Sequence, residues 1–396
     1  MMGQRGFSLI EMAAATALTL AVTAVAFAVI DPAQAGFAAQ LEAPDMQQRL
    51  RAAGGSLYKE LVMAGAGFSG GANAGSLGYH FAPVLPFRVG TSHDDPPGSF
   101  RTDTITLIYV PPTFAQTTLA TAGPGATVAD IGVNTGAGCP IGDVLCGFKE
   151  GMSVLIFDPG DGSGAYDTFA ITDAQLNVLH VERVGGSLTR TDYQPDTTAI
   201  VEVTSIVYSL KIDAVAGTYQ LVASDSGGAD VPVVDHLVAL TFHYYGEAQP
   251  PELAGSAPAT TYGSRPPALE QQIATHGYPA GENCTFAIDP ASGLHSPRLE
   301  VLGASGSGSA LVPLAGAELT DGPWCPDDTN VNRWDADLLR IRKIGVTLRV
   351  QAANAALRGP AGVLFTNGGT SRSRNRWLPD LQVRFDVTPR NMEFGR

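Results

Sequence analysis

Glu11 is the residue in the first part of the chain whose chemistry most needs a partner. It stands at the start of an apolar run, because the 19 residues from Met12 to Ile30 include no charged side chain. A helix of that length rises about 28 Å, close to the thickness of a hydrocarbon core of about 30 Å. A carboxylate beside such a segment is costly in lipid unless a cation meets it. The pattern therefore predicts that Glu11 is a functional residue with a cationic partner.

The residues before Glu11 form a recognisable motif. They are Arg5, Gly6, Phe7, Ser8, Leu9 and Ile10, and Arg5 favours a cytoplasmic N-terminus. This stretch resembles the leader and processing motif of type IV pilins and type II secretion pseudopilins. The resemblance implies that a prepilin peptidase cuts after Gly6 and that Phe7 is N-methylated. It also implies that Glu11 pairs with the N-terminal amine of a neighbouring subunit. Residues 48–65 resemble the matching part of minor pilins of the PilW type and of J-type pseudopilins.

Two other interpretations of the N-terminus remain open. Ala33-Gln34-Ala35 offers a cleavage site for an ordinary secretory signal peptide, although the apolar run is longer than the usual core of about 7–15 residues. A plain signal anchor would leave the chain uncut. The three interpretations predict different first residues of the mature protein, namely Phe7, Gly36 and Met1.

The four cysteines predict two disulfides rather than a zinc site. They form no C-x-x-C pair and no histidine lies near them at metal-ligand spacing. Pairing between neighbours gives Cys139–Cys146 and Cys284–Cys325, in an oxidising compartment. Four cysteines allow three connectivities, and reduced buried thiols are the alternative.

Two acidic stretches are candidates for calcium, because Ca²⁺ prefers oxygen ligands. The main one follows Cys325 and contains Asp327, Asp328, Asn330, Asn332, Asp335 and Asp337. The lesser one contains Asp158, Asp161 and Asp167. Neither stretch has EF-hand spacing, and Asp and Asn are also common turn residues.

Several other patterns favour no chemistry. The string from Gly67 through Ser69 to Gly71 matches a nucleophile elbow in letters, but a helix precedes it where a strand is required. Turn glycines explain this string and the two glycine-rich strings that begin at Gly65 and Gly160. The seven histidines are scattered: His80, His93, His180, His236, His243, His276 and His295. We therefore expect no enzyme activity.

A basic loop near the C-terminus raises the question of nucleic acid. It contains Arg372, Arg374, Arg376 and Trp377, and a cationic loop with an aromatic ring can contact DNA. The 57 residues from Arg340 onwards hold 11 basic and 3 acidic residues, a net charge of +8, whereas the other 339 residues hold 13 and 35, a net charge of −22. Because the body is acidic, we expect a solvated loop, or a contact with an acidic neighbouring subunit, rather than DNA binding.

The elements that position these residues are an N-terminal helix and many short strands. The chain has 46 Gly and 27 Pro, which long helices do not tolerate, and several segments after Gly71 alternate polar and apolar residues. In 381–387 the polar residues Gln382, Arg384 and Asp386 would face water, and in 238–244 His243 would point outward. The strand-like segments 152–158 and 166–172 flank a glycine-rich turn at 159–164, which predicts a hairpin. We predict a leader at 1–6, a transmembrane and assembly helix at 7–30, and its amphipathic continuation at 31–67, weakened at Gly54-Gly55. Two β-rich parts of the head at 68–245 and 269–396 would be separated by a Pro/Gly-rich loop at 246–268.

The sequence thus predicts an α+β fold, with a long helix packed on a large antiparallel head. The resemblance implies a minor pilin or pseudopilin that helps to initiate or cap a type IV pilus. Its partners would be a prepilin peptidase, other pilins and the inner membrane, with the head first periplasmic and later on the pilus. The alternatives are a type II secretion pseudopilin, a tethered adhesin-like binding module, and a protein secreted after cleavage behind Ala35. Apart from the calcium candidates, no cofactor is expected.

Overall fold

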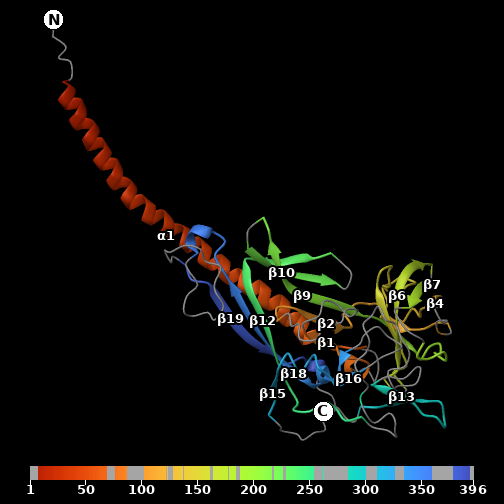
Figure 1. The fold of residues 1–396 in the computed structure, drawn as a ribbon. Helices are drawn as coiled ribbons and strands as arrows, with labels where there is room; N and C mark the ends of the chain where they lie inside the picture. Colours follow the sequence, from red (N-terminus) through yellow and green to blue (C-terminus); the bar gives the residue numbers. More distant parts are fainter. Residues whose placement is uncertain are drawn as a thin grey trace.

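One long helix, α1 (Leu9–Met63), leads from the N-terminal end of the chain to a β-rich head (Figure 1). Its 55 residues correspond to a length of about 80 Å. The helix is continuous through Asp31-Pro32, where the apolar run ends, and through Gly54-Gly55, where we expected it to weaken. The fold is α+β, with one apolar N-terminal helix and a large antiparallel head, as the sequence predicts.

The computed structural model describes most of the chain. The described residues are 8–68, 76–86, 102–121, 123, 128–136, 138–160, 164–176, 178–183, 188–215, 218–225, 229–253, 262, 284–299, 310–325, 334–358 and 378–392. Among them, every pairing between named strands is antiparallel.

Three larger sheets make up the head. The five-stranded sheet has the order β1 (Val84–Pro86), β2 (Ile105–Tyr109), β9 (Thr204–Asp213), β10 (Thr218–Asp225), β11 (Val231–Asp235). The four-stranded sheet has the order β15 (Val312–Leu314), β12 (Leu237–Gly246), β18 (Ile341–Val350), β19 (Leu381–Val387). The six-stranded sheet has the order β3 (Gln116–Thr118), β8 (Ala199–Glu202), β5 (Ser153–Phe157), β6 (Tyr166–Gln175), β7 (Val178–Arg183), β4 (Val128–Gly132).

Smaller elements complete the head. Two short hairpins pair β13 (Phe286–Ile288) with β14 (His295–Pro297) and β16 (Trp324–Cys325) with β17 (Trp334–Asp335). Four 3₁₀ turns are η1 (Leu77–Tyr79), η2 (Ala336–Arg340), η3 (Ala355–Leu357) and η4 (Arg390–Met392). The hairpin expected on either side of residues 159–164 is present as β5 and β6, which pair directly.

The division of the head differs from the predicted one. Strand β12 lies before 246–268 and strand β18 lies after it, yet the two pair over nearly their whole length. The loop therefore does not separate two sets of strands. The distinct unit of the head is instead the six-stranded sheet. Its strands are inserted in the sequence between β2 and β9, and it has its own apolar core. This sheet lies in the part of the head remote from the N-terminus (Figure 1).

The predicted alternation of burial holds in β19 and β12 and fails in β2 and β18. In β19 the side chains of Gln382, Arg384 and Asp386 are exposed, as expected. All five residues of β2 are buried, and in β18 even Arg349 is only 4% exposed. A central strand with both faces covered has no side open to water, so its polar residues are buried too.

Candidate functional site

The first turn of α1 is closed by a reciprocal cap between Ser8 and Glu11. The Ser8 hydroxyl accepts a hydrogen bond from the Glu11 N–H at 3.3 Å, and the Glu11 carboxylate accepts one from the Ser8 N–H at 2.9 Å. A Ser followed three residues later by Glu is a known signature of a helix start, so this cap could have been read from the sequence. Gly6 and Phe7, the predicted processing residues, lie outside the described residues.

The apolar segment at the start of α1 is not buried against the head. Residues Leu9–Ala28 form 20 residues of apolar helix, and none of that window is buried. Large apolar side chains there are 60–89% exposed: Leu9, Ile10, Met12, Leu18, Leu20, Val22, Val25 and Phe27. The helix is long and apolar enough to cross a membrane, a property that signal sequences share. Apolar surface on this scale is costly in water, so it needs a cover from outside the chain.

Both predicted disulfides are present, with the predicted connectivity. Cys139 is bonded to Cys146, and Cys284 is bonded to Cys325. The first closes a short loop beside the six-stranded sheet, whereas the second joins the β13–β14 hairpin to β16. The described residues contain no free cysteine.

The acidic stretch after Cys325 is only partly described, because Asp327, Asp328, Asn330 and Asn332 lie outside the described residues. Asp335 caps η2 by accepting the N–H of Asp337 at 2.8 Å, and it also accepts the N–H of Gly322. Asp337 forms an ion pair with Arg340 at 3.2 Å. Both carboxylates therefore have a structural role within the chain. Burial, with nearby Asp337 and Asp321, raises the pKa of Asp335 to about 7.

The two described members of the lesser acidic group, Asp158 and Asp167, have separate partners within the chain. The Asp158 side chain accepts the N–H of Gly160 at 2.9 Å in a turn, and Asp161 lies outside the described residues. Asp167 is 1% exposed and forms an ion pair with Arg183 at 2.8 Å. Among the described residues, no group of three or more His, Cys, Asp or Glu side chains is arranged to hold a metal ion.

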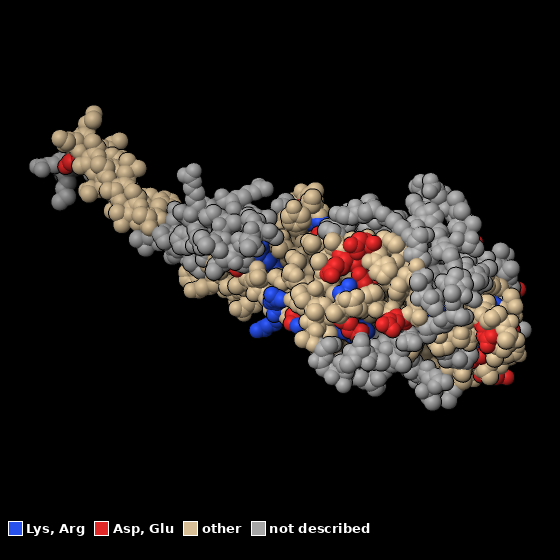
Figure 2. All heavy atoms as spheres, turned by 60° about the horizontal axis from the view of Figure 1, so that its bottom comes forward, with Lys and Arg blue, Asp and Glu red and all other residues tan. Residues whose placement is uncertain are grey.

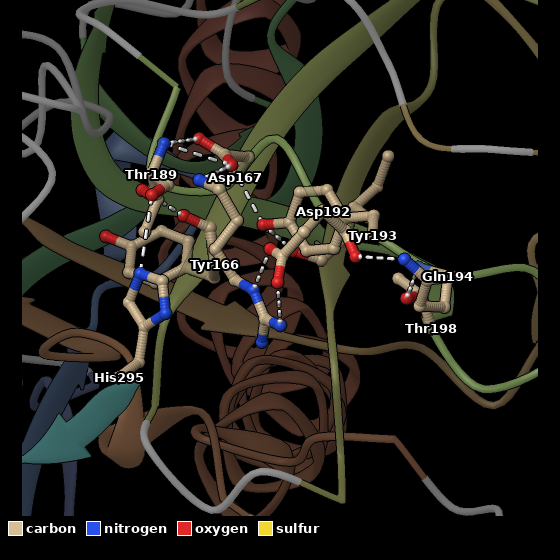
Figure 3. A network of polar contacts seen from close by, with 10 residues as sticks. Tyr166, Asp167, Thr189, Asp192, Tyr193, Gln194, Thr198 and His295 are labelled. Carbon is tan, nitrogen blue, oxygen red and sulfur yellow. Dashed lines mark hydrogen bonds and ion pairs between the residues drawn. The ribbon is translucent and has the colours of Figure 1, made fainter. Parts of the chain in front are cut away.

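Asp167 instead organises a buried polar network that the sequence did not reveal (Figure 3). Its carboxylate accepts the backbone N–H groups of Thr189 and Arg190 and the Tyr193 hydroxyl, the last at 2.8 Å. Burial and the adjacent Asp167 raise the pKa of Tyr193 well above its usual value, so the hydroxyl stays protonated. The network fixes the β7–β8 connection on the six-stranded sheet. Its partners are distant in sequence, and no local spacing signals them.

Most of the described histidines have separate, structural partners. His80 bonds the carbonyl of Gly164 at 2.8 Å, and His295 contacts the carbonyl of Thr189 at 3.3 Å. His180 pairs with Asp130, and His243 is exposed on β12, as expected. Burial lowers the pKa of His236, with Arg49 and Arg358 adding to the effect. His93 and His276 lie outside the described residues, as do Ser69, Gly71 and the basic loop with Arg372, Arg374, Arg376 and Trp377.

The chain was compared with protein-family models, with curated proteins and with solved structures, and none of the three comparisons finds a match.

Proposed function

We propose that this protein is a type IV pilin-like subunit, a minor pilin or pseudopilin, anchored by α1 and assembled through it. The observation that carries the proposal is the apolar segment Leu9–Ala28, which is fully unburied and carries the Glu11 carboxylate in its first turn. In a membrane, lipid covers this surface; in a filament, the helices of neighbouring subunits cover it. Glu11 then stands where the cationic N-terminus of a neighbour can meet it.

We propose that the N-terminal part of α1 serves assembly and that its C-terminal part holds the head on the helix. Met46, Leu57 and Leu61 have no exposed surface and belong to the main apolar core. Ser56 bonds the Tyr208 hydroxyl of β9 at 2.9 Å, and Glu42 accepts the N–H of Ala353 at 2.6 Å. One rigid helix would thus connect an assembly surface to a displayed head.

The large head favours a low-copy tip or priming subunit over a repeating shaft subunit, because bulky heads crowd a close-packed filament. A type IV pilus is preferred to a type II secretion pseudopilus on the family resemblance. Deletion of the gene, with pilus number and secreted protein measured in parallel, tests this preference. Loss of surface pili with normal secretion supports the pilus, and the reverse result supports the pseudopilus.

The central test is the start of the mature chain. Mass spectrometry of protein purified from membranes should find N-methylated Phe7 as the first residue, and this product should disappear in a strain that lacks prepilin peptidase. A chain that starts at Gly36 would show a secretory signal peptide, and one that starts at Met1 would show a plain anchor. Either result would overturn the proposal.

A further inference from the structure

An apolar groove runs between α1 and the edge strand β19. It has a volume of about 520 Å³ and lies beside the part of the helix that enters the head. It is lined by Gln47, Leu50, Arg51, Gly54, Gly55, Tyr58, Val383 and Phe385. Within the described residues, β19 pairs only with β18, so its outer side carries no further strand. The groove is thus an open, largely apolar surface that a helix lying alongside α1 would cover.

The two glycines at the groove are not required by packing within the chain. A Cβ atom at Gly54 would make only ordinary contacts, 3.6 Å from Phe385 and 4.0 Å from Leu348. A Cβ atom at Gly55 would meet nothing within 4 Å. Each glycine costs about 1 kcal/mol relative to alanine inside a helix. Because the chain itself gains nothing from these two residues, they indicate close approach by something outside it.

The same helix carries an exposed apolar pair that has no cover in the head. Phe37 is 68% exposed and Leu41 is 77% exposed, and they lie one turn apart on α1, beyond the apolar window that ends at Ala28. Two copies of α1 anchored in one membrane must run parallel. A shift of 14 residues between them, about 21 Å, sets Leu41 of one copy opposite Gly55 of the other.

Charges support the same register. A shift of 14 residues also sets Phe37 opposite Arg51 and Asp45 opposite Lys59. Neither Arg51 nor Lys59 has an ion pair with a described residue. Asp45 forms an ion pair with Arg49 of its own helix, yet its side chain is 48% exposed. Figure 2 shows Lys and Arg side chains gathered near the place where the helix enters the head. Arg51 lines the groove, and the segment from Phe37 to Asp45 offers an apolar pair followed by a carboxylate.

We propose that the groove binds residues 37–45 of α1 from a second copy of this chain, displaced along the helix axis. The side chain of Leu41 enters at Gly55, and Asp45 of the incoming helix pairs with Lys59. The contact joins two different surfaces, so it can line up the few copies of a tip or priming subunit instead of closing a two-fold dimer. The inference rests on the proposed function, because membrane anchoring makes the helices parallel.

Cysteine cross-linking in membranes tests this register. The double variant Leu41→Cys/Gly55→Cys should form a ladder of disulfide-linked oligomers under mild oxidation, because every copy carries both thiols. Within one helix the two positions are about 21 Å apart, too far for a bond inside one copy. Leu41 is exposed and cysteine suits a helix better than glycine, so we expect the variant to fold. The matched control is Leu41→Cys/Ala52→Cys, since Ala52 is exposed on α1 outside the groove lining.

The ladder should be about tenfold more abundant in the Gly55 variant than in the Ala52 control, as expected for thiols held side by side. Equal ladders, no ladder, or a dimer from Gly55→Cys alone would overturn the proposed register. A dimer from the single variant would indicate a two-fold pairing. The absence of a ladder would indicate that the groove does not bind a second copy of this chain and is covered by the helix of a different subunit. The N-terminus of the same membrane samples is sequenced. A processed, membrane-bound protein without a ladder refutes this inference alone, whereas an unprocessed chain refutes the proposed function.

Discussion

Ser8 and Glu11 satisfy each other's backbone N–H groups at the start of α1, through hydrogen bonds of 3.3 and 2.9 Å. In a chain cut after Gly6, Ser8 would be the second residue of the mature protein. The carboxylate would then have two tasks, which are to cap its own helix and to meet the amine of a neighbour. The two tasks differ in one respect, because only the second requires a charge.

Glu11→Gln separates these two tasks, because glutamine can cap a helix but carries no charge. We expect Glu11→Gln and Glu11→Ala to remain in the membrane fraction. Both should be incorporated into filaments far less than the wild type, since neither attracts the neighbour's amine. Immunoblotting of sheared filaments and membranes measures this. If Glu11→Gln assembles normally and Glu11→Ala does not, the cap is the important feature and charge pairing is refuted.

The ion pair between Asp167 and Arg183 should be essential to the six-stranded sheet. Asp167→Ala removes the carboxylate that pairs with the buried Arg183 guanidinium, and we expect a loss of about 3–5 kcal/mol in the free energy of unfolding. Asp192→Ala is the control, because Asp192 also pairs with a buried arginine, Arg190, but the Asp192 side chain is 63% exposed, so water can take the place of its carboxylate. That variant should lose less than about 1 kcal/mol. Urea unfolding of both variants gives the comparison, and equal losses would contradict the prediction.

Asp335 should make stability depend on pH. Its pKa is about 7 in the folded chain, against an ordinary value of 3.8 for an aspartate, so the folded state binds the proton more tightly. The stabilisation is present at low pH and is lost as the pH rises through 7. The expected loss is about 2–3 kcal/mol between about pH 5 and pH 8.

Urea unfolding at both pH values measures this effect, with Asp335→Asn for comparison. The variant cannot titrate at this position, so its stability should fall less over the same range, even if the amide caps η2 less well. The charges that face Asp335 are those of Asp337 and Asp321, and Arg340 lies against Asp337. An unchanged pH dependence in Asp335→Asn would show that another group is responsible.

The two disulfides should contribute unequally to stability. Cys139 and Cys146 are 7 residues apart, whereas Cys284 and Cys325 are 41 residues apart. Closing a longer loop removes more entropy from the unfolded chain. Replacing the second pair with serine should therefore cost about 1–2 kcal/mol more than replacing the first. Thermal unfolding of the two double variants compares them, and a larger loss from the first pair would contradict the loop-entropy account.

Gly54→Ala and Gly55→Ala should each stabilise the isolated protein by about 1 kcal/mol, because alanine restricts the unfolded chain and no contact forbids its Cβ atom. The measurement is thermal unfolding in detergent. A loss of stability at either position would show that packing within the chain does require the glycine.

The features that the sequence alone determined are local. The apolar length before Asp31, the Ser8–Glu11 spacing, the alternation in β19 and the turn between β5 and β6 each depend on neighbouring residues. Such residues fix backbone geometry and one-sided burial without help from the rest of the chain. The disulfide pairing also followed from proximity in sequence.

Only the tertiary structure decided which distant segments share a sheet. Strands β12 and β18 pair across the loop that we took for a boundary, because their apolar faces complete one core, and that complementarity has no local signature. Burial on both faces of β2 and β18, the partners of Asp167 and the groove beside Gly55 have the same origin. Each depends on surfaces that folding brings together. Whether a polar group there finds a partner, or a glycine faces an uncovered groove, depends on which segments exclude solvent from it and not on the residue type.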